Sequence, residues 1–80
     1  MKRFATSGHR AVNAYGIKSA AKQFTEIKAR KEFGIKGTVG AFQVTSESAE
    51  WKIVEVSAFI GKRHGNTTTG HNVNFSVFEL

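Results

Sequence analysis

The segment Trp51–Ile60 limits the possible folds more than any other part of the chain, because it is apolar at nearly every position. Successive side chains of an extended strand point to opposite faces, so this segment presents two apolar faces. These faces consist of Val54, Val56, Ala58 and Ile60 on one side and of Trp51, Ile53 and Phe59 on the other. A strand that is apolar on both faces lies inside a sheet. The pattern therefore predicts an interior strand.

Two further segments alternate between apolar and polar residues, as half-buried strands do. The first is Thr38–Thr45, in which Gly40 indicates a bulge or a close approach of another backbone. The second is His71–Phe78, whose apolar side chains fall on one face. The short polar link Ser46–Glu50 predicts a hairpin between the first two strands, whereas Gly61–Gly70 predicts a longer loop. We expect the three strands to form an antiparallel meander.

A helix is predicted over Ala20–Phe33, where apolar residues recur at helical spacing. Ser19 is a suitable N-cap, and Gly34 follows where a glycine commonly ends a helix. A shorter helix is predicted over Gly8–Tyr15, and Lys2–Ala5 fits a short edge strand.

The predicted fold class is therefore α+β, with one or two N-terminal helices packed on a three-stranded antiparallel β-meander in a two-layer sandwich. Eighty residues correspond to a single domain, 1–80. The absence of cysteine and of an apolar leader or membrane-length run leads us to expect a cytoplasmic protein without membrane contact.

The net charge of +6 is unevenly distributed along the chain. Residues 1–37 hold nine of the twelve lysines and arginines but only two of the six glutamates. A concentration of positive charge raises the rate of encounter with anionic surfaces, whether nucleic acid or acidic protein. The sequence therefore favours a binding role for the first half of the chain.

Groups that carry chemistry are few. The three histidines His9, His64 and His71 show no metal-ligand spacing, and no cofactor is expected. The stretch Gly61-Lys62-Arg63-His64-Gly65 places two cations beside a histidine, as phosphodiester chemistry requires. This strand ending and the expected element order resemble the small basic ribonuclease toxins of bacterial toxin–antitoxin pairs. The resemblance implies a ribonuclease as one alternative.

Two nucleic-acid motifs match only in part. Ala11–Phe24 resembles the turn region of DNA-reading helix pairs, yet Lys22 and Thr25 stand where that motif needs apolar residues. Lys36–Val44 echoes a strand of the RNA-recognition fold, which stacks bases on outward aromatic rings. Phe42 is the only aromatic residue of this strand, and aromatic residues such as Phe42, Phe59 and Phe75 belong more often to a core than to a stacking platform.

The stretches Gly37–Phe42, Ala58–Gly61 and Thr68–Asn72 are similar to those of small proteins encoded by phages and mobile elements. Within that group the chain resembles anti-CRISPR-type inhibitors in size and in its lack of enzymatic motifs. The resemblance implies a protein that binds a host nucleoprotein complex and blocks its nucleic-acid groove. It assigns no role to any single residue.

The leading hypothesis is therefore a small non-enzymatic inhibitor, present as a monomer or homodimer. Its basic surface would dock on the acidic surface of a host protein or nucleoprotein complex and occlude nucleic acid. Direct binding to the phosphate backbone of DNA or RNA is the alternative, and the ribonuclease is the second alternative. The residues expected to bind are Arg10, Lys18, Lys22, Arg30, Lys31, Lys62, Arg63 and His64.

Overall fold

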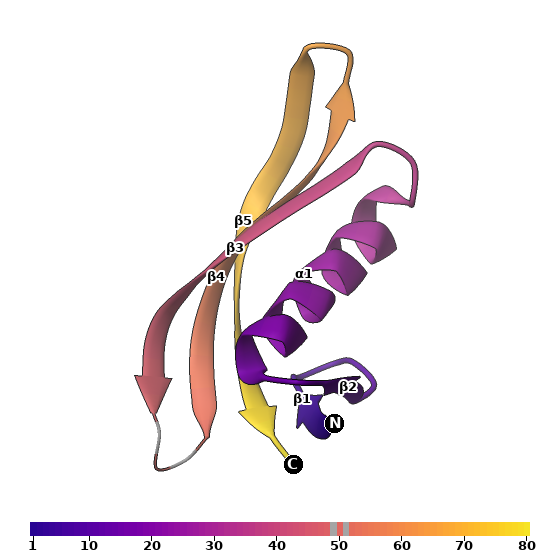
Figure 1. The fold of residues 1–80 in the computed structure, drawn as a ribbon. Helices are drawn as coiled ribbons and strands as arrows, with labels where there is room; N and C mark the ends of the chain where they lie inside the picture. Colours follow the sequence, from indigo (N-terminus) through magenta and orange to yellow (C-terminus); the bar gives the residue numbers. More distant parts are fainter. Residues whose placement is uncertain (49, 51) are drawn as a thin grey trace.

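In the computed structural model, which describes residues 1–48, 50 and 52–80, a helix crosses one face of a five-stranded antiparallel sheet (Figure 1). The elements are β1 (Lys2–Ala5), β2 (Val12–Ala14), α1 (Ile17–Phe33), β3 (Thr38–Ser48), β4 (Ile53–His64) and β5 (Thr67–Glu79). The strands lie side by side in the order β2-β1-β5-β4-β3. The N-terminal hairpin thus joins the last strand of the chain, and both termini lie at the same end of the molecule.

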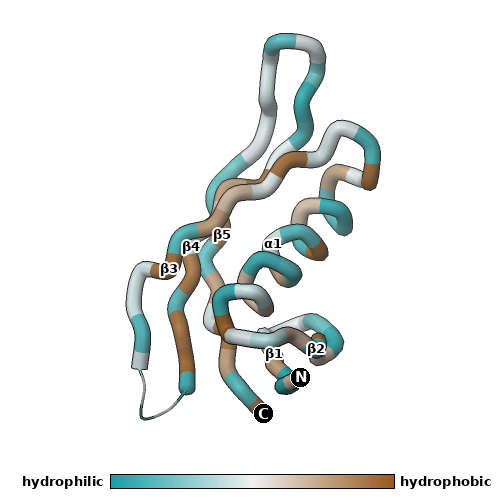
Figure 2. The backbone as a smooth tube through the Cα atoms, viewed as in Figure 1, coloured by the Kyte–Doolittle hydropathy of each residue, from teal (hydrophilic) through white to brown (hydrophobic). Residues whose placement is uncertain are grey.

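The core lies between α1 and the sheet. Buried side chains of the helix meet a buried row on β4 and β5, which the paired positions bring to the same face. The fully buried members include Phe4, Ala20, Ala21, Phe24, Val56 and Val77. Figure 2 shows the apolar stretches of β4 and β5 beneath the helix, whereas the hairpin beyond the helix end is mostly hydrophilic. The alternation predicted for His71–Phe78 is confirmed, since Val73, Phe75 and Val77 pack toward the helix.

The helix begins three residues earlier than predicted. Gly16, and not Ser19, is the N-cap, and no side chain caps this end. The extra turn brings Ile17 against the core, so burial of an apolar side chain outweighs the missing cap. Gly34 is confirmed as the end of the helix: its φ is 86°, and its N–H donates to the Arg30 carbonyl oxygen at 2.9 Å.

Gly40 is confirmed as a site of close approach. A Cβ atom at this position would lie 3.2 Å from the Cγ2 atom of Thr25 on the helix. Thr25 and Ala29 face it with small side chains, and the buried Thr25 hydroxyl donates to the Ala21 carbonyl oxygen at 2.8 Å. The irregularity in the strand lies elsewhere, between Val44 and Ser46, where the register with β4 shifts.

The predicted fold class is wrong, because the described chain has one helix and a sheet of five strands in place of a three-stranded meander. No helix forms over Gly8–Tyr15. Gly8 has a φ of 80°, which a helix does not allow, and Val12–Ala14 instead pairs with β1. Lys2–Ala5 is a strand, but it lies between β2 and β5 and so is not at the edge. Pairing this hairpin onto β5 buries Phe4 and Ala14.

The loop predicted over Gly61–Gly70 is also wrong. The β4–β5 pairing runs without interruption from Ile53 opposite Phe78 to His64 opposite Thr67. Gly65, with a φ of 59°, is the first residue of the two-residue connection, the position at which type II′ turns require glycine. Trp51, predicted as the first residue of the strand, lies outside the described residues. The part of this hairpin that projects beyond the helix, residues 61–70, is called the arm below (Figure 1).

Two facing glycines lie at the point where the arm joins the rest of the sheet. Gly61 pairs with Gly70, and the Phe59 ring occupies the space that their side chains would fill. A Cβ atom at Gly61 would lie 2.5 Å from the Thr69 carbonyl oxygen, and one at Gly70 would lie 2.7 Å from the Gly61 Cα atom. The two strands are therefore too close here for any side chain.

We expect Gly70→Ala to lower the free energy of unfolding by about 1–3 kcal/mol, because the new methyl group has no room. Urea unfolding followed by circular dichroism measures this change. Gly16→Ser is the matched control, since a Cβ atom there meets no atom within 4 Å and its backbone is extended. A Gly70→Ala protein as stable as the control would contradict the close packing.

Candidate binding surfaces

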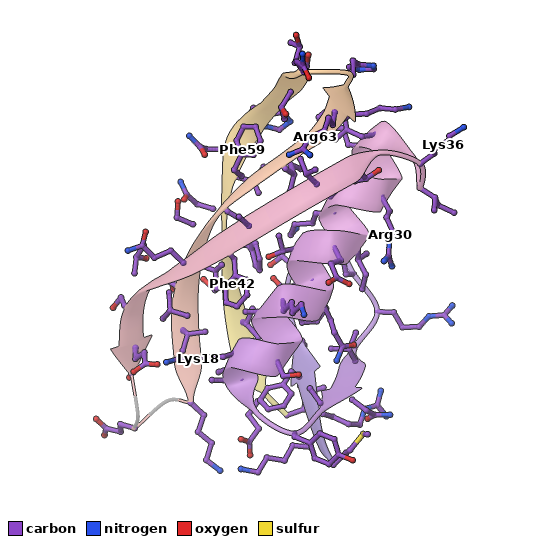
Figure 3. All side chains as sticks on the ribbon, turned by 45° about the horizontal axis from the view of Figure 1, so that its top comes forward. Lys18, Arg30, Lys36, Phe42, Phe59 and Arg63 are labelled. Carbon is purple, nitrogen blue, oxygen red and sulfur yellow. The ribbon has the colours of Figure 1, made fainter. Side chains whose placement is uncertain are left out.

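Positive residues are concentrated in the chain where the helix ends and the arm begins. We call this end of the molecule the distal end; it holds Arg30, Ile35, Lys36, Lys62, Arg63 and His64, of which Figure 3 labels Arg30, Lys36 and Arg63. Successive side chains of a strand alternate, so Lys62 and Arg63 point to opposite faces of the sheet. Two hydrogen bonds to main-chain carbonyl oxygens stabilise this end. The Arg63 N–H donates to the Gly37 carbonyl oxygen at 2.9 Å, and the Thr38 hydroxyl donates to the Gly34 carbonyl oxygen. The connection from helix to β3 is thereby tied to the base of the arm.

Four of the eight residues that the sequence predicted to bind, namely Arg30, Lys62, Arg63 and His64, lie at this end of the molecule, in the last turn of the helix and at the base and turn of the arm. Lys31 instead lines a groove on the other side of the helix. Arg10 lies in the β1–β2 connection and Lys22 in the middle of the helix. Lys18 lies in the first helical turn, at the opposite end from Arg30, Lys36 and Arg63 (Figure 3). With a rise of 1.5 Å per residue, Lys18 and Arg30 are about 18 Å apart along the helix axis. The residues predicted to form a single binding surface therefore lie in separate parts of the molecule.

Ion pairing differs between the two ends of the molecule. At the end that holds the termini, Glu79 lies 3.7 Å from the Lys2 Nζ atom and 3.3 Å from the Lys52 Nζ atom. On the helix, Arg30 pairs with Glu26 at 3.6 Å. Among the described residues, no carboxylate lies within 4.0 Å of the charged groups of Lys36, Lys62 or Arg63. Elsewhere on the described chain Arg3, Arg10, Lys18 and Lys22 likewise have no carboxylate within this distance, so the distal end is one of several places where cations are unpaired.

An apolar side chain stands among these cations. Ile35 is 84 % exposed, although it lies between Gly34 and Lys36 in a well-formed connection. It borders a hollow of about 410 Å³ between the helix and the edge strand β3, whose lining also includes Ala29, Arg30 and Val39. Sequence reasoning missed Ile35 and left Lys36 out of the binding set. The signal was present as a single large apolar residue within the polar run Gly34–Gly37.

A second cationic surface lies on the other side of the helix. This α1–β5 groove, of about 450 Å³, is lined by His9, Lys28, Lys31, Glu32, Ile60, His71, Val73 and Asn74. Its members come from the β1–β2 connection, the helix, β4 and β5. The Lys28 Nζ atom lies 5.0 Å from the centre of the Phe75 ring, and the His9 ring centre lies 6.4 Å from that of Phe24. Aromatic contacts therefore orient both side chains.

The positive charges of the groove repel one another. Partial burial lowers the pKa of His9, and the nearby charges of Lys28 and Lys31 lower it further. The pKa of Lys28 is lowered by burial and then by Lys31. Each shift has the direction expected when positive charge is crowded and partly removed from water. His9 is thus held mainly as the neutral imidazole at neutral pH.

His71 has the opposite environment. Its Nε2 atom lies 2.5 Å from a carboxylate oxygen of Glu32, and its Nδ1 atom lies 3.4 Å from the Asn72 carbonyl oxygen. Both ring nitrogens face acceptors, which favours the doubly protonated cation. The hydrogen bond to Glu32, followed by that to Asn72, raises the pKa of His71. The groove therefore contains two histidines whose pKa values are shifted in opposite directions.

The remaining sequence predictions have these outcomes. The DNA-reading helix pair does not form, because the region before α1 is a strand. Phe42 and Phe75 pack toward the helix, whereas Phe59 lies on the opposite face over the glycine pair. His64 is exposed beside the turn of the arm, and no hydrogen bond of its ring occurs within the described part of the chain. Among the described residues, no group of three or more metal-ligating side chains comes together.

Comparisons with protein families, with curated proteins and with solved structures found no match for this chain. In the part of the chain that the structure describes, no helix has the length and apolar character needed to cross a membrane. The proposed function therefore rests on the surfaces of the molecule.

The His71–Glu32 pair predicts a pH-dependent stability. Because the folded-state pKa of His71 is raised, the pair stabilises the fold fully below the unfolded pKa, near 6.5, and loses this effect as pH rises through the folded value. We expect Glu32→Gln to lower the free energy of unfolding more at pH 6 than at pH 9, as measured by urea unfolding.

Glu26→Gln provides the control for this experiment. It removes an i, i+4 ion pair with Arg30 that involves no histidine, so its cost of about 0.3–0.5 kcal/mol should be the same at both pH values. A Glu32→Gln effect equally independent of pH would contradict the protonated state assigned to His71.

Proposed function

We propose that this protein is a non-enzymatic binding protein that docks its distal end on an acidic surface of a larger assembly. The proposal is carried by one observation: Lys36, Lys62 and Arg63 have no carboxylate within 4.0 Å among the described residues, and Ile35 in the adjoining connection is exposed. Unpaired cations steer the encounter with an anionic surface, and the apolar side chain supplies contact area once the surfaces meet.

The arrangement matches the anatomy of protein interfaces more closely than that of nucleic-acid interfaces. Protein interfaces have an apolar centre and a polar rim. Here Ile35 supplies the exposed apolar contact, and Arg30 lines the hollow beside it together with Glu26 and Thr38. A phosphate backbone offers no comparable apolar partner for Ile35. This feature favours an acidic protein surface as the first partner.

The resemblance to anti-CRISPR-type inhibitors gives the proposal a narrower form. In that form the partner is a host nucleoprotein complex, and the bound protein keeps nucleic acid out by steric occlusion. The shape suits this role, because the molecule is elongated, with extents of 43 × 21 × 20 Å, and its arm projects beyond the rest of the fold. Because the arm is anchored at its base, it can cover a part of the partner's surface that the rest of the protein does not reach.

The test is a comparison of two charge-reversed proteins as baits in a nuclease-treated bacterial lysate. Lys36→Glu with Arg63→Glu alters the distal end, whereas Lys18→Glu with Lys22→Glu makes the same change in net charge elsewhere. We expect the first pair to lower recovery of the partner at least about tenfold and the second to have a much smaller effect. Mass spectrometry of the retained proteins measures recovery. Equal losses from both baits would contradict a localised docking surface.

A further variant tests the apolar centre. Ile35→Ser should leave the stability unchanged within about 0.5 kcal/mol, since the side chain is exposed. It should nevertheless weaken partner binding about fivefold to thirtyfold, the usual effect of removing a central apolar contact. Unchanged affinity for the isolated partner would count against Ile35 as part of the interface.

Direct binding of nucleic acid remains the second candidate, favoured by the four lysines of the helix. Lys18, Lys22, Lys28 and Lys31 all lie on α1, with Lys18 lining a hollow beside β3 and Lys28 and Lys31 lining the α1–β5 groove. Lysines of this kind can contact the phosphates of a nucleic-acid backbone. Gel-shift assays of duplex DNA and RNA over a salt series distinguish the two functions. A steep loss of affinity with salt supports this candidate, and no shift at low salt supports the protein partner.

A further inference from the structure

The α1–β5 groove takes no part in the docking proposed above, yet it concentrates more ionisable groups than any other described hollow of the molecule. Two lysines, two histidines and one glutamate line it. Its volume of about 450 Å³ falls within the usual range for small-molecule sites. Lys28 and Lys31, one helical turn apart, present their charges to the same space from α1, His9 from the β1–β2 connection and His71 from β5.

We propose that this groove binds a phosphate group, held by the ammonium groups of Lys28 and Lys31 and by a ring N–H group of His9. A phosphate carries close to two negative charges near neutral pH and several acceptor oxygens. It therefore matches a site with several nitrogen donors and excess positive charge better than a single carboxylate does.

The charge balance of the groove supports an anion. Its only carboxylate, that of Glu32, is already engaged by the His71 ring at 2.5 Å. The two lysines have no carboxylate within 4.0 Å among the described residues. Burial lowers the pKa values of His9 and Lys28, and repulsion among Lys28, Lys31 and His9 lowers them further. A bound phosphate would offset that repulsion.

The site is also partly organised before any ligand arrives. Lys28 is positioned by its contact with the Phe75 ring, and His71 is held by Glu32 and lies beside the Phe33 ring, with 6.0 Å between ring centres. Val73 and Ile60 provide apolar walls beneath the charged groups. Donors fixed in this way lose little conformational freedom on binding. The fold therefore orients Lys28 against Phe75 and His9 against Phe24 before a ligand binds.

The first experiment follows the three histidine rings by NMR during a pH titration, in chloride and in inorganic phosphate at equal ionic strength. Phosphate should raise the pKa of His9, because a bound anion favours the charged imidazole. His64 is the internal control, since it lies on the arm outside the groove. An absent His9 response, or an equal response of His64, would overturn the proposal.

The second experiment measures the affinity for inorganic phosphate from the same spectra. We expect Lys28→Gln with Lys31→Gln to weaken binding at least about tenfold, whereas Lys18→Gln with Lys22→Gln, with the same change in net charge, should have little effect. If the first protein does not fold, Lys31→Gln alone serves, because Lys31 is exposed. Equal weakening by both pairs would show general charge attraction and would overturn the site.

A third arm identifies the source of the phosphate. If adenosine 5′-monophosphate binds more tightly than inorganic phosphate, the site takes a nucleotide; if it binds equally or less tightly, the site takes free phosphate. Either result supports a phosphate site. None of these measurements involves Lys36, Arg63 or Ile35. Failure of the phosphate proposal would therefore not count against the proposed docking surface, and failure of the docking surface would not count against the phosphate site.

Discussion

The pairing of β4 with β5 is the interaction on which the rest of the structure depends. Its register runs unbroken from Ile53 opposite Phe78 to His64 opposite Thr67. One half of this ladder supplies the apolar row that α1 covers, and the other half continues past the helix as the arm. A slip of one residue would turn Val56 and Val77 away from the helix and expose the core. The close contact of Gly61 with Gly70, covered by the Phe59 ring, restricts such a slip at the point where helical support ends.

The distal end follows from a difference in length. A 17-residue helix is about 25 Å long, whereas a 12-residue strand extends about 40 Å, so the hairpin must pass beyond the helix that covers it. Gly34 ends the helix, and the chain returns to the sheet through Ile35 and Lys36. The side chains of this return have no further layer to pack against. Ile35 therefore remains exposed, and the connection that holds Lys36 is tied to the base of the arm through the hydrogen bond from the Arg63 N–H to the Gly37 carbonyl oxygen.

Elements with a clear apolar spacing could be predicted from the sequence. Segments whose structure depends on pairing with a distant strand could not. The helix, the three long strands and the close approach at Gly40 follow from apolar spacing and from glycine positions. Gly61–Gly70 was predicted as a loop because glycines and threonines are common in loops, yet the glycines face each other and the threonines extend the strand. Val12–Ala14 is too short to show a period, and only its pairing with β1 makes it a strand. The α1–β5 groove joins residues 62 positions apart, His9 and His71, and no local pattern signals it.

The distribution of ion pairs says more about function than the count of charges does. Glu79 neutralises two lysines at the end that holds the termini, so the fold can place a carboxylate between cations where stability needs one. At the distal end and in the groove the same chain leaves Lys36, Arg63, Lys28 and Lys31 without such a partner among the described residues. A chain of 80 residues buries a limited core and has little stability to spare for uncompensated repulsion. Negative charge supplied from outside the chain would offset this repulsion, which is the physical basis of both proposed surfaces.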